Sequence, residues 1–328
     1  MQTVKGMRLM KHCSENPVAV AIGPSSFAEE DATPLRILED AGISIIPNPH
    51  GRRLTEEETM ALLQDADGLL AGLEPLTRRV LASASRLKAV ARVGIGMDNV
   101  DVSAAMELGI KISNTPEGPT DAVAEMTVTA LLSLCRRLIP ANAALHSGEW
   151  KKMIGDGMKG RKVLLIGFGR IGSRVAELLH AFGAVVMACD PVLTEHVAKS
   201  SGVRSVSIAD GLAEADVISL HAGGSYPLLG VQEFKLMRRG VIILNSARGA
   251  LIDESALISA LEMGVVSQAW LDVFSEEPYR GPLSRFPQVL LTPHISTYTR
   301  QCRLAMEKAA VVNILNDLSL ARGTGNES

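Results

Sequence analysis

Residues 163 to 190 read VLLIGFGRIGSRVAELLHAFGAVVMACD and carry the pattern on which the fold prediction depends. A short apolar run leads directly into three glycines with the spacing GxGxxG, which are Gly167, Gly169 and Gly172. Apolar residues then recur at helical spacing until Gly183, where a second β-branched run begins and leads to Asp190. The stretch therefore predicts a strand, a glycine turn, a helix and a second strand.

Each of these residue types has a physical role in dinucleotide binding. Gly167 permits a tight turn, Gly169 lets backbone N–H groups approach a pyrophosphate, and Gly172 lets helix and strand pack closely. The helix N-terminus offers unpaired N–H donors to the same anion. Asp190 is placed to accept from the adenosine ribose, and its carboxylate repels a 2′-phosphate, so the pattern predicts NAD rather than NADP. Glycine triplets also occur by chance in loops, but here the flanking strands and helix all agree.

Length and composition limit the class of protein. The chain has 328 residues, too many for one ordinary domain, and its 47% hydrophobic content can supply two cores. Its net charge is −3 and it has no basic run, so we expect no nucleic-acid partner. No segment reaches the ~18 apolar residues of a membrane span, so we expect no membrane partner.

The cysteines indicate the compartment. Four are present without CxxC spacing, namely Cys13, Cys135, Cys189 and Cys302. This usage is typical of a reducing cytoplasm, and it predicts neither a disulfide framework nor a metal site.

Two regions of strand–helix alternation predict an α/β protein with two doubly wound parallel sheets. In the first region, the apolar runs VAVAI, ISII, GLLAG and LKAVARV and a last run at 110–112 alternate with helical stretches. One of these helices is opened by a capping box of Thr55 and Glu58. In the second region, the glycine-turn unit is followed by VISLH, VIILN, SQAWLDV and VLLT.

Two long helices are predicted from apolar residues at helical spacing. The helix at 120–138 is expected to bury Val123, Met126, Ala130, Leu131, Leu134 and Leu138. A terminal helix after Pro293 is expected to bury Leu304, Ala305, Ala309, Val312, Leu315 and Leu318. The first sixteen residues and the last eight read as loose tails.

Polar side chains follow several strands of the second region, where open α/β sheets bind their ligands. Of the seven histidines, His221 and His294 each come directly after an apolar strand. Arg248 follows another strand, and Asp272 and Glu277 follow a fourth. A buried arginine needs an anion, so the partner of Arg248 is a substrate carboxylate or one of these acids. Taken alone, His294 fits a buried core histidine better than a catalytic one.

The combination of cofactor and side chains changes that interpretation. An NAD enzyme that oxidises an alcohol needs a base to take the hydroxyl proton while hydride leaves the same carbon. A histidine supplies this base. A neighbouring carboxylate stabilises the protonated imidazole, so that the same residue can return the proton in the reducing direction.

Six motifs occur in the order and spacing of a known family. They are VGIGMDNVD, NTPEGPTDAVAE, GFGRIG, NSARG, DVFSEEP and TPHIS. Through them the chain, from about residue 18 to about residue 315, resembles the D-isomer-specific 2-hydroxyacid dehydrogenases, particularly the phosphoglycerate-dehydrogenase-like members. The resemblance implies an NAD-dependent oxidoreductase that acts on the CH–OH group of a small 2-hydroxy carboxylate, or reduces the 2-oxo acid. It also implies a homodimer joined through the nucleotide domain.

The resemblance further implies a domain arrangement and a set of site residues. A Rossmann NAD-binding domain at 118–297 would be inserted in a flavodoxin-like substrate domain at 17–117 and 298–320, after a flexible tail at 1–16. Arg248 would bind the substrate carboxylate and 2-oxo group, His294 would be the general acid/base, and Glu277 would pair with it. The substrate carboxylate would also meet the backbone N–H groups of Gly94, Ile95 and Gly96. The cofactor site would comprise Gly167, Gly169, Arg170, Ile171, Gly172, Asp190, Ala222, Ser246, Ala247, Asp272, which would hold the nicotinamide carboxamide, and Ser296.

Departures from the family pattern bear on the substrate. Members that use 3-phosphoglycerate tend to carry Arg and Ser where this chain has Ala71-Gly72-Leu73-Glu74, and an acidic residue there would repel a phosphate. One rival interpretation is an NAD-sensing dimeric binding protein on the same fold, against which the Arg, Glu and His set argues. A second rival, a formate or phosphite dehydrogenase, is disfavoured because formate-oxidising relatives usually place Gln at the position of Glu277.

Overall fold

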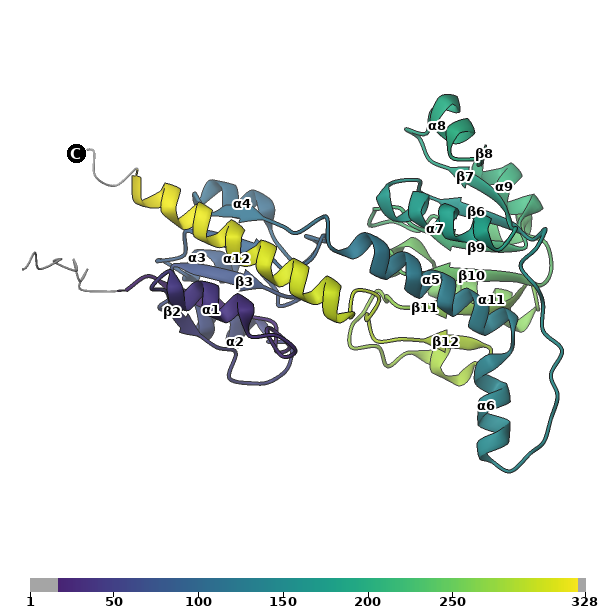
Figure 1. Cartoon of the computed structure of the whole chain (residues 1–328), viewed down its shortest axis with the longest axis horizontal. Coiled ribbons are helices and arrows are strands. Elements are labelled where there is room, and N and C mark those ends of the chain that lie inside the picture. Colours follow the sequence, from purple (N-terminus) through teal and green to yellow (C-terminus); the bar gives the residue numbers. More distant parts are fainter. Residues whose placement is uncertain (1–16, 324–328) are drawn as a thin grey trace, which may run out of the picture. The chain divides into compact units, whose positions relative to one another are not determined.

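The computed structural model describes residues 17–323, so the tail expected at 1–16 lies outside the described residues. Of the tail expected over the last eight residues, 324–328 also lie outside them, whereas 321–323 belong to the terminal helix. Within this range the chain forms two compact units (Figure 1). The first comprises residues 17–119 and the terminal segment from residue 300, and the second comprises residues 120–299. Each unit contains one parallel sheet with helices packed on it, which confirms the predicted fold class.

The first unit has a five-stranded sheet in the order β2-β1-β3-β4-β5. Its strands are β1 (Ala19–Ile22), β2 (Ser44–Ile46), β3 (Gly68–Ala71), β4 (Ala89–Arg92) and β5 (Lys111–Ser113). Its helices are α1 (Thr33–Asp40), α2 (Glu56–Leu63), α3 (Arg78–Ser83), α4 (Val102–Glu107) and α12 (Arg300–Gly323). This strand order is that of flavodoxin-like folds, in which the chain changes direction across the sheet between β1 and β3.

Local sequence accounts for the helix starts of this unit. Thr55 and Glu58 form the predicted capping box at the start of α2. Thr77 and Asp101 cap α3 and α4 by accepting from backbone N–H groups three residues further on. These bonds satisfy donors that the first helical turn leaves unpaired.

The terminal helix α12, yellow in Figure 1, packs on β3, β4 and β5 and against α1. The prediction of its buried face was wrong at three of the six positions, because Ala305, Ala309 and Val312 are exposed. The buried residues are Cys302, Met306, Glu307, Ala310, Val311, Ile314 and Leu318. Apolar residues occur around much of this helix, so their period alone did not identify the face that the sheet covers.

The second unit has a seven-stranded sheet in the order β12-β11-β10-β9-β6-β7-β8. Its strands are β6 (Lys162–Ile166), β7 (Val185–Cys189), β8 (Arg204–Ser205), β9 (Val217–Leu220), β10 (Val241–Asn245), β11 (Val266–Leu271) and β12 (Val289–Leu291). Its helices are α5 (Pro119–Cys135), α6 (Leu138–His146), α7 (Arg170–Ala181), α8 (Glu195–Ser200), α9 (Ile208–Glu214), α10 (Val231–Leu236) and α11 (Glu254–Glu262), with 3-10 turns η1 (Gly249–Leu251) and η2 (Pro282–Arg285). The order is Rossmann-like, with its switch point between β6 and β9.

Alternation along the strands of the second unit divides its core into two layers. Leu164 and Ile166 of β6 belong to the cluster on one face, and Val163 and Leu165 belong to the cluster on the other. Because both faces are covered by helices, the central strands are mostly apolar, whereas the short edge strand β8 is polar and exposed.

The helix predicted at 120–138 is interrupted. It ends at Cys135, and Arg137 adopts a left-handed conformation (φ 54°) before α6 begins. Leu138 was expected on the buried face, but it starts α6 and is 60% exposed. Among residues 17–323, no helix has the length and apolar character needed to cross a membrane.

Candidate active site and cofactor-binding turn

The glycine turn connects β6 to α7 at the carboxyl edge of the second sheet. Gly167 has a φ of +97°, and a Cβ there would lie 2.6 Å from the backbone carbon of His221. A Cβ at Gly172 would overlap the carbonyl oxygen of Gly167. Glycine is therefore required at both positions, one for conformation and one for close packing.

The start of α7 is open to a ligand. Gly169 caps the helix, and a Cβ there would meet nothing within 4 Å. Gly169 and Arg170 are exposed, and Ile171 is half-buried. The N–H groups at the first turn of a twelve-residue helix, with open space beside Gly169, fit the pyrophosphate of a dinucleotide.

Asp190 directly follows β7, and its carboxylate links the glycine turn to the loop after β7. Its Oδ2 accepts from the N–H of Phe168 at 2.8 Å, and its Oδ1 accepts from the N–H of Val192 at 2.9 Å. These bonds fix the carboxylate, and each oxygen keeps acceptor capacity for a ribose hydroxyl. The residues present therefore fit the adenosine half of NAD.

His221, directly after β9, packs against the glycine turn at Gly167 and Gly172. Its Nε2 is 2.8 Å from Ser219 Oγ, and its N–H donates to the carbonyl of Ile166. Burial lowers the pKa of His221 to about 4. The imidazole is therefore neutral near pH 7, and this is a structural histidine.

His294 and Glu277 form the acid–base pair expected from the strand ends. Nδ1 of His294 lies 3.0 Å from Oε2 of Glu277. The other carboxylate oxygen, Oε1, accepts from the N–H of Phe274 at 3.1 Å. His294 adopts a left-handed backbone conformation with a φ of 54°. Because Nδ1 meets the carboxylate, Nε2 is the ring nitrogen available to a reacting group.

Asp272 holds the segment that carries His294. It is fully buried, and its two oxygens accept from Thr292 Oγ1, from the N–H groups of Ile295 and Ser296, and from the Ser296 hydroxyl. Trp270 Nε1 in turn donates to Thr292 Oγ1 at 2.9 Å. A carboxylate offers about four acceptor positions, and these donors use them. The predicted bond from Asp272 to a nicotinamide carboxamide would therefore have to replace one of these donors.

Sequence reasoning did not identify Trp270 or Thr292 as part of this support. Thr292 lies two residues before the catalytic candidate, in the TPH sequence, and its position there was the available signal.

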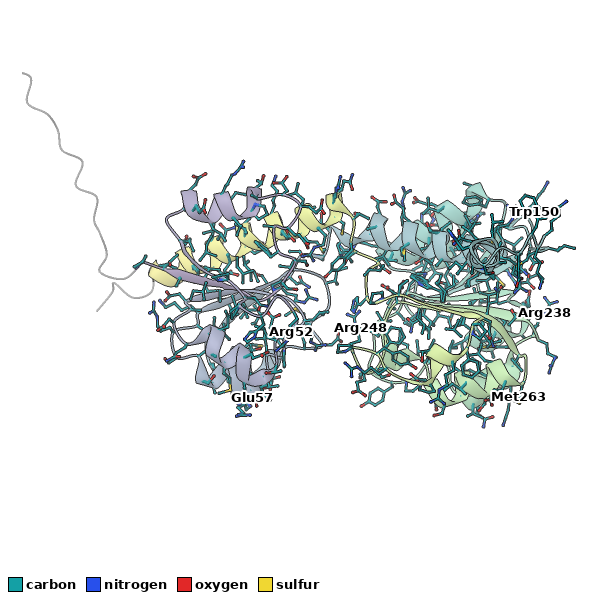
Figure 2. The ribbon with its side chains drawn as sticks, turned by 90° about the horizontal axis from the view of Figure 1, so that it is seen from below. Arg52, Glu57, Trp150, Arg238, Arg248 and Met263 are labelled. Atoms are coloured by element: carbon teal, nitrogen blue, oxygen red, sulfur yellow. The ribbon has the colours of Figure 1, made fainter. Side chains whose placement is uncertain are left out.

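Arg248 lies in the loop after β10 and is half-buried. Its Nη1 donates to the carbonyl of Ala247 at 2.7 Å. The side chain of Asn245 fixes the loop, because it donates to the carbonyl of Arg248 and accepts from the N–H of Ala247. Figure 2 shows the Arg248 side chain at the margin of the second unit. Ser246 of the same loop lies 3.4 Å from Thr127 Oγ1 of α5.

The other expected site residues are placed as follows. Ala222 follows His221 at the carboxyl end of β9, and the N–H of Ala222 lies next to Gly167. In the first unit, Gly94 follows β4, but its N–H donates to Thr115 Oγ1 at 2.8 Å rather than facing a ligand. Asn114 holds the carbonyl of Ile95 at 2.9 Å. The prediction for this loop therefore depends chiefly on Ile95 and Gly96.

Among residues 17–323, no three His, Cys, Asp or Glu side chains are grouped so that they could hold a metal ion. A Rossmann-like sheet, a glycine turn of this kind and a histidine paired with a carboxylate are typical of nicotinamide-dependent dehydrogenases.

Comparison with known proteins identifies the family. Residues 128–296 match the model of the NAD binding domain of D-isomer specific 2-hydroxyacid dehydrogenases. The glyoxylate reductase of Aeropyrum pernix is 36% identical over 274 residues, covering 79% of this chain and 82% of the relative. The D-3-phosphoglycerate dehydrogenase of Methanocaldococcus jannaschii is 38% identical over 84% of this chain, which spans about half (53%) of that relative. The crystal structure of the TT0316 protein from Thermus thermophilus superposes with a TM-score of 0.84 at 32% identity, covering 92% of this chain and 97% of that one.

The chain belongs to the D-isomer specific 2-hydroxyacid dehydrogenase family. It is an NAD-dependent oxidoreductase that acts on 2-hydroxy acids. This activity favours the dehydrogenase interpretation over that of an NAD-sensing binding protein.

Proposed function

We propose that the protein reduces a short 2-oxo carboxylate to the D-2-hydroxy acid, with His294 as the general acid and Arg248 as the ligand of the substrate carboxylate. The observation that carries this proposal is the 3.0 Å contact between His294 Nδ1 and Glu277 Oε2. With the Nδ1 proton directed at the Glu277 carboxylate, Nε2 is the nitrogen that takes up and gives the transferred proton, and the proton donor in the reducing direction is the imidazolium. The similarity to glyoxylate reductases supports a small substrate.

The site residues of the second unit have separate roles in the reaction. NADH, when bound, supplies the hydride that C2 of the substrate receives. His294 donates its Nε2 proton to the oxygen on C2, and Glu277 stabilises the imidazolium before transfer. Arg248 binds the carboxylate through charge-assisted hydrogen bonds and thereby orients C2. In the oxidising direction His294 takes the proton back.

The remaining site assignments follow from the same proposal. Residues 17–117 and 298–320 form the substrate domain, in which Ile95 and Gly96 offer N–H groups to the carboxylate, and residues 118–297 form the NAD-binding domain. Ala222, Ser246, Ala247 and Ser296 line the cofactor site together with the glycine turn. The free thiols of Cys135, Cys189 and Cys302 are compatible with a cytoplasmic enzyme.

A homodimer is the proposed assembly. The helix α6 and the segment after it carry a run of exposed apolar side chains, namely Leu138 (60% exposed), Ile139 (46%), Leu145 (58%), Trp150 (83%) and Ile154 (96%). Figure 1 shows α6 and this segment extending from the body of the second unit. Soluble proteins rarely expose contiguous apolar surface of this kind without a partner, and a second copy supplies a matching one.

The proposed activity is tested by following NADH oxidation with glyoxylate, hydroxypyruvate, pyruvate, phosphohydroxypyruvate and 2-oxoglutarate. We expect one or more short 2-oxo acids to be reduced, and H294A to lower kcat by roughly 10²–10⁴-fold with the Kd of NADH little changed. As a control, H196N alters an exposed histidine of α8. Unchanged turnover in H294A would remove the role of His294.

A further inference from the structure

The segment that follows β11 contains a tyrosine that the proposed mechanism does not use. Glu277, the partner of His294, lies in this segment, and its Oε1 accepts from the N–H of Phe274 at 3.1 Å. Its Oε2 lies 3.0 Å from Nδ1 of His294. Because hydrogen bonds are directional, the N–H of Phe274 helps to set the rotation of the carboxylate. The position of Phe274 therefore affects how Glu277 meets the histidine.

Tyr279 holds Phe274 in place. The two rings are stacked, with their centroids 4.3 Å apart and their planes inclined at 22°. The hydroxyl of Tyr279 donates to Oε1 of Glu254 at 2.8 Å and accepts from the N–H of Leu283 at 3.1 Å. A Cβ at Gly281 would overlap this hydroxyl, so the glycine leaves the space that it occupies. The ring on which Phe274 stacks is thus fixed at its far end.

Glu254 connects the hydroxyl to a helix. It lies in the first turn of α11, where the helix dipole favours a negative charge. Burial raises the pKa of Tyr279 to about 12, and the hydrogen bond to Glu254 acts in the same direction. The tyrosine therefore keeps its proton near pH 7 and donates it to the carboxylate. A continuous series of contacts runs from α11 through Tyr279 to Phe274.

The loop of Arg248 packs on the same segment. A Cβ at Gly249 would overlap the backbone of Phe274. Next to this contact lies a cavity of about 20 Å³, which gives room for about one water molecule and is bordered by Gly249, Phe274 and Leu283 among others. Because this cavity leaves Phe274 space to shift, the stacked ring of Tyr279 is needed to hold it.

We propose that Tyr279 is a positioning residue, which orients Glu277 through Phe274. It thereby keeps the Nδ1 proton of His294 directed at the carboxylate and leaves Nε2 to exchange the proton with the substrate. This role rests on the proposed function, in which His294 and Glu277 are the acid–base pair. All of these residues belong to the second unit.

Substitutions at both ends of the hydroxyl contact test this role. Y279F keeps the ring and should lower kcat roughly tenfold, less than the ~10²-fold cost of a displacement of about 1 Å, with KM and the Kd of NADH little changed. E254A should have a similar effect, whereas E254Q keeps an acceptor oxygen and should recover most of the activity. The matched control is E262A, which removes an exposed acid at the other end of α11.

A double-mutant cycle separates positioning from a purely structural role. If Tyr279 acts through Glu277, Y279F should change kcat by less than about twofold once E277A has removed the carboxylate. A loss of equal size in both backgrounds would overturn the proposal, because the tyrosine would then act independently of Glu277.

The tautomer of His294 gives a readout that needs no turnover. The nitrogen NMR shifts of the ring show which nitrogen of the neutral imidazole carries the proton, and loss of the signals in H294N assigns them. We expect the Nδ1–H tautomer in the wild type, E254Q and E262A, and a mixture of tautomers in Y279F and E254A.

The same spectra distinguish failure of this role from failure of the proposed function. Equal Nδ1–H populations in the wild type and Y279F would overturn the positioning role and leave the His294–Glu277 pair intact. An Nε2–H tautomer in the wild type would contradict the pair itself, and both proposals with it. If the wild type reduces none of the 2-oxo acids, the proposed substrate class fails, and the tautomer measurement still decides the role of Tyr279.

Discussion

At the scale of one residue, the carboxylate of Asp272 holds the segment that carries His294. Its oxygens fasten residues on both sides of His294, whose left-handed backbone needs such support. We expect D272N to lower kcat by roughly 10- to 100-fold, because a displacement of about 1 Å at a catalytic group has this effect. The Kd of NADH, measured by fluorescence titration, should change little.

The control for this prediction is D67N. Asp67 is also a buried carboxylate, but it binds the N–H of Ala19 and the side chains of Arg86 and Lys88 in the first unit. D67N should reduce stability and leave kcat intact. A large increase in the Kd of NADH in D272N, with kcat preserved, would instead assign Asp272 to the nicotinamide carboxamide.

His221 makes stability depend on pH. Its folded-state pKa of about 4 lies below the ~6.5 of an unfolded histidine, so the unfolded chain binds the proton more readily between these values. The stabilisation is complete above pH 6.5 and is lost as the pH falls toward 4, by on the order of 3 kcal/mol. In H221N, the free energy of unfolding from urea titrations should lose this part of its pH dependence. The exposed-site variant H196N should follow the wild type. An H221N curve parallel to that of the wild type would contradict the prediction.

The glycine turn illustrates the scale of the element, since its glycines serve different purposes. G172A places a methyl group against the carbonyl of Gly167 and should destabilise the β6–α7 unit by about 1–3 kcal/mol. G169A meets only open space, so the protein should fold. It should nevertheless bind NADH roughly tenfold or more weakly, because a backbone donor to a charged phosphate contributes about 1.5–3 kcal/mol.

Melting curves and NADH titrations distinguish these two variants. G157A provides the control, because Gly157 also borders open space and lies outside the turn. Equal effects of G169A and G172A on stability and on binding would show that the turn acts as one structural unit rather than as a ligand cradle.

Elements with strong local signals agreed with prediction, and elements without them did not. The β6–α7–β7 unit and the Thr55 capping box are as expected, because apolar period and cap chemistry are local. The break after Cys135 and the two-residue strand β8 were not predicted. Pro140, in the first turn of α6, was an available signal for the break, because a proline disfavours continuation of the preceding helix. The strand β8 is too short for its residues to show a strand period.

At the scale of the whole molecule, the exposed apolar segment around Trp150 predicts a dimer. Figure 2 shows Trp150 at the outer margin of the second unit. The double variant W150S/I154D should sediment with half the mass of the wild type, because it places polar groups where the interface excludes water. Of the two tryptophans, Trp270 is already fully buried. A blue shift of the tryptophan fluorescence with rising protein concentration would therefore report the burial of Trp150.

The matched control for the dimer is M263D. Met263 is 59% exposed on the same unit and lies at the end of α11, away from the segment around Trp150. This variant should sediment like the wild type. A wild-type protein that sediments as a monomer at all concentrations would exclude the proposed assembly.

The sequence by itself determined the two parallel sheets, the glycine turn, the NAD-type acid at residue 190 and the candidates Arg248, Glu277 and His294, because strand ends and cap residues are encoded locally. Only the tertiary structure decided which face of α12 is buried, that Asp272 binds the backbone next to His294, and that Glu74 packs against the glycines that follow β1 and β3. These features depend on contacts between residues far apart in the chain. The burial and the hydrogen-bond partners of a side chain are set by that packing, and no period or motif specifies them.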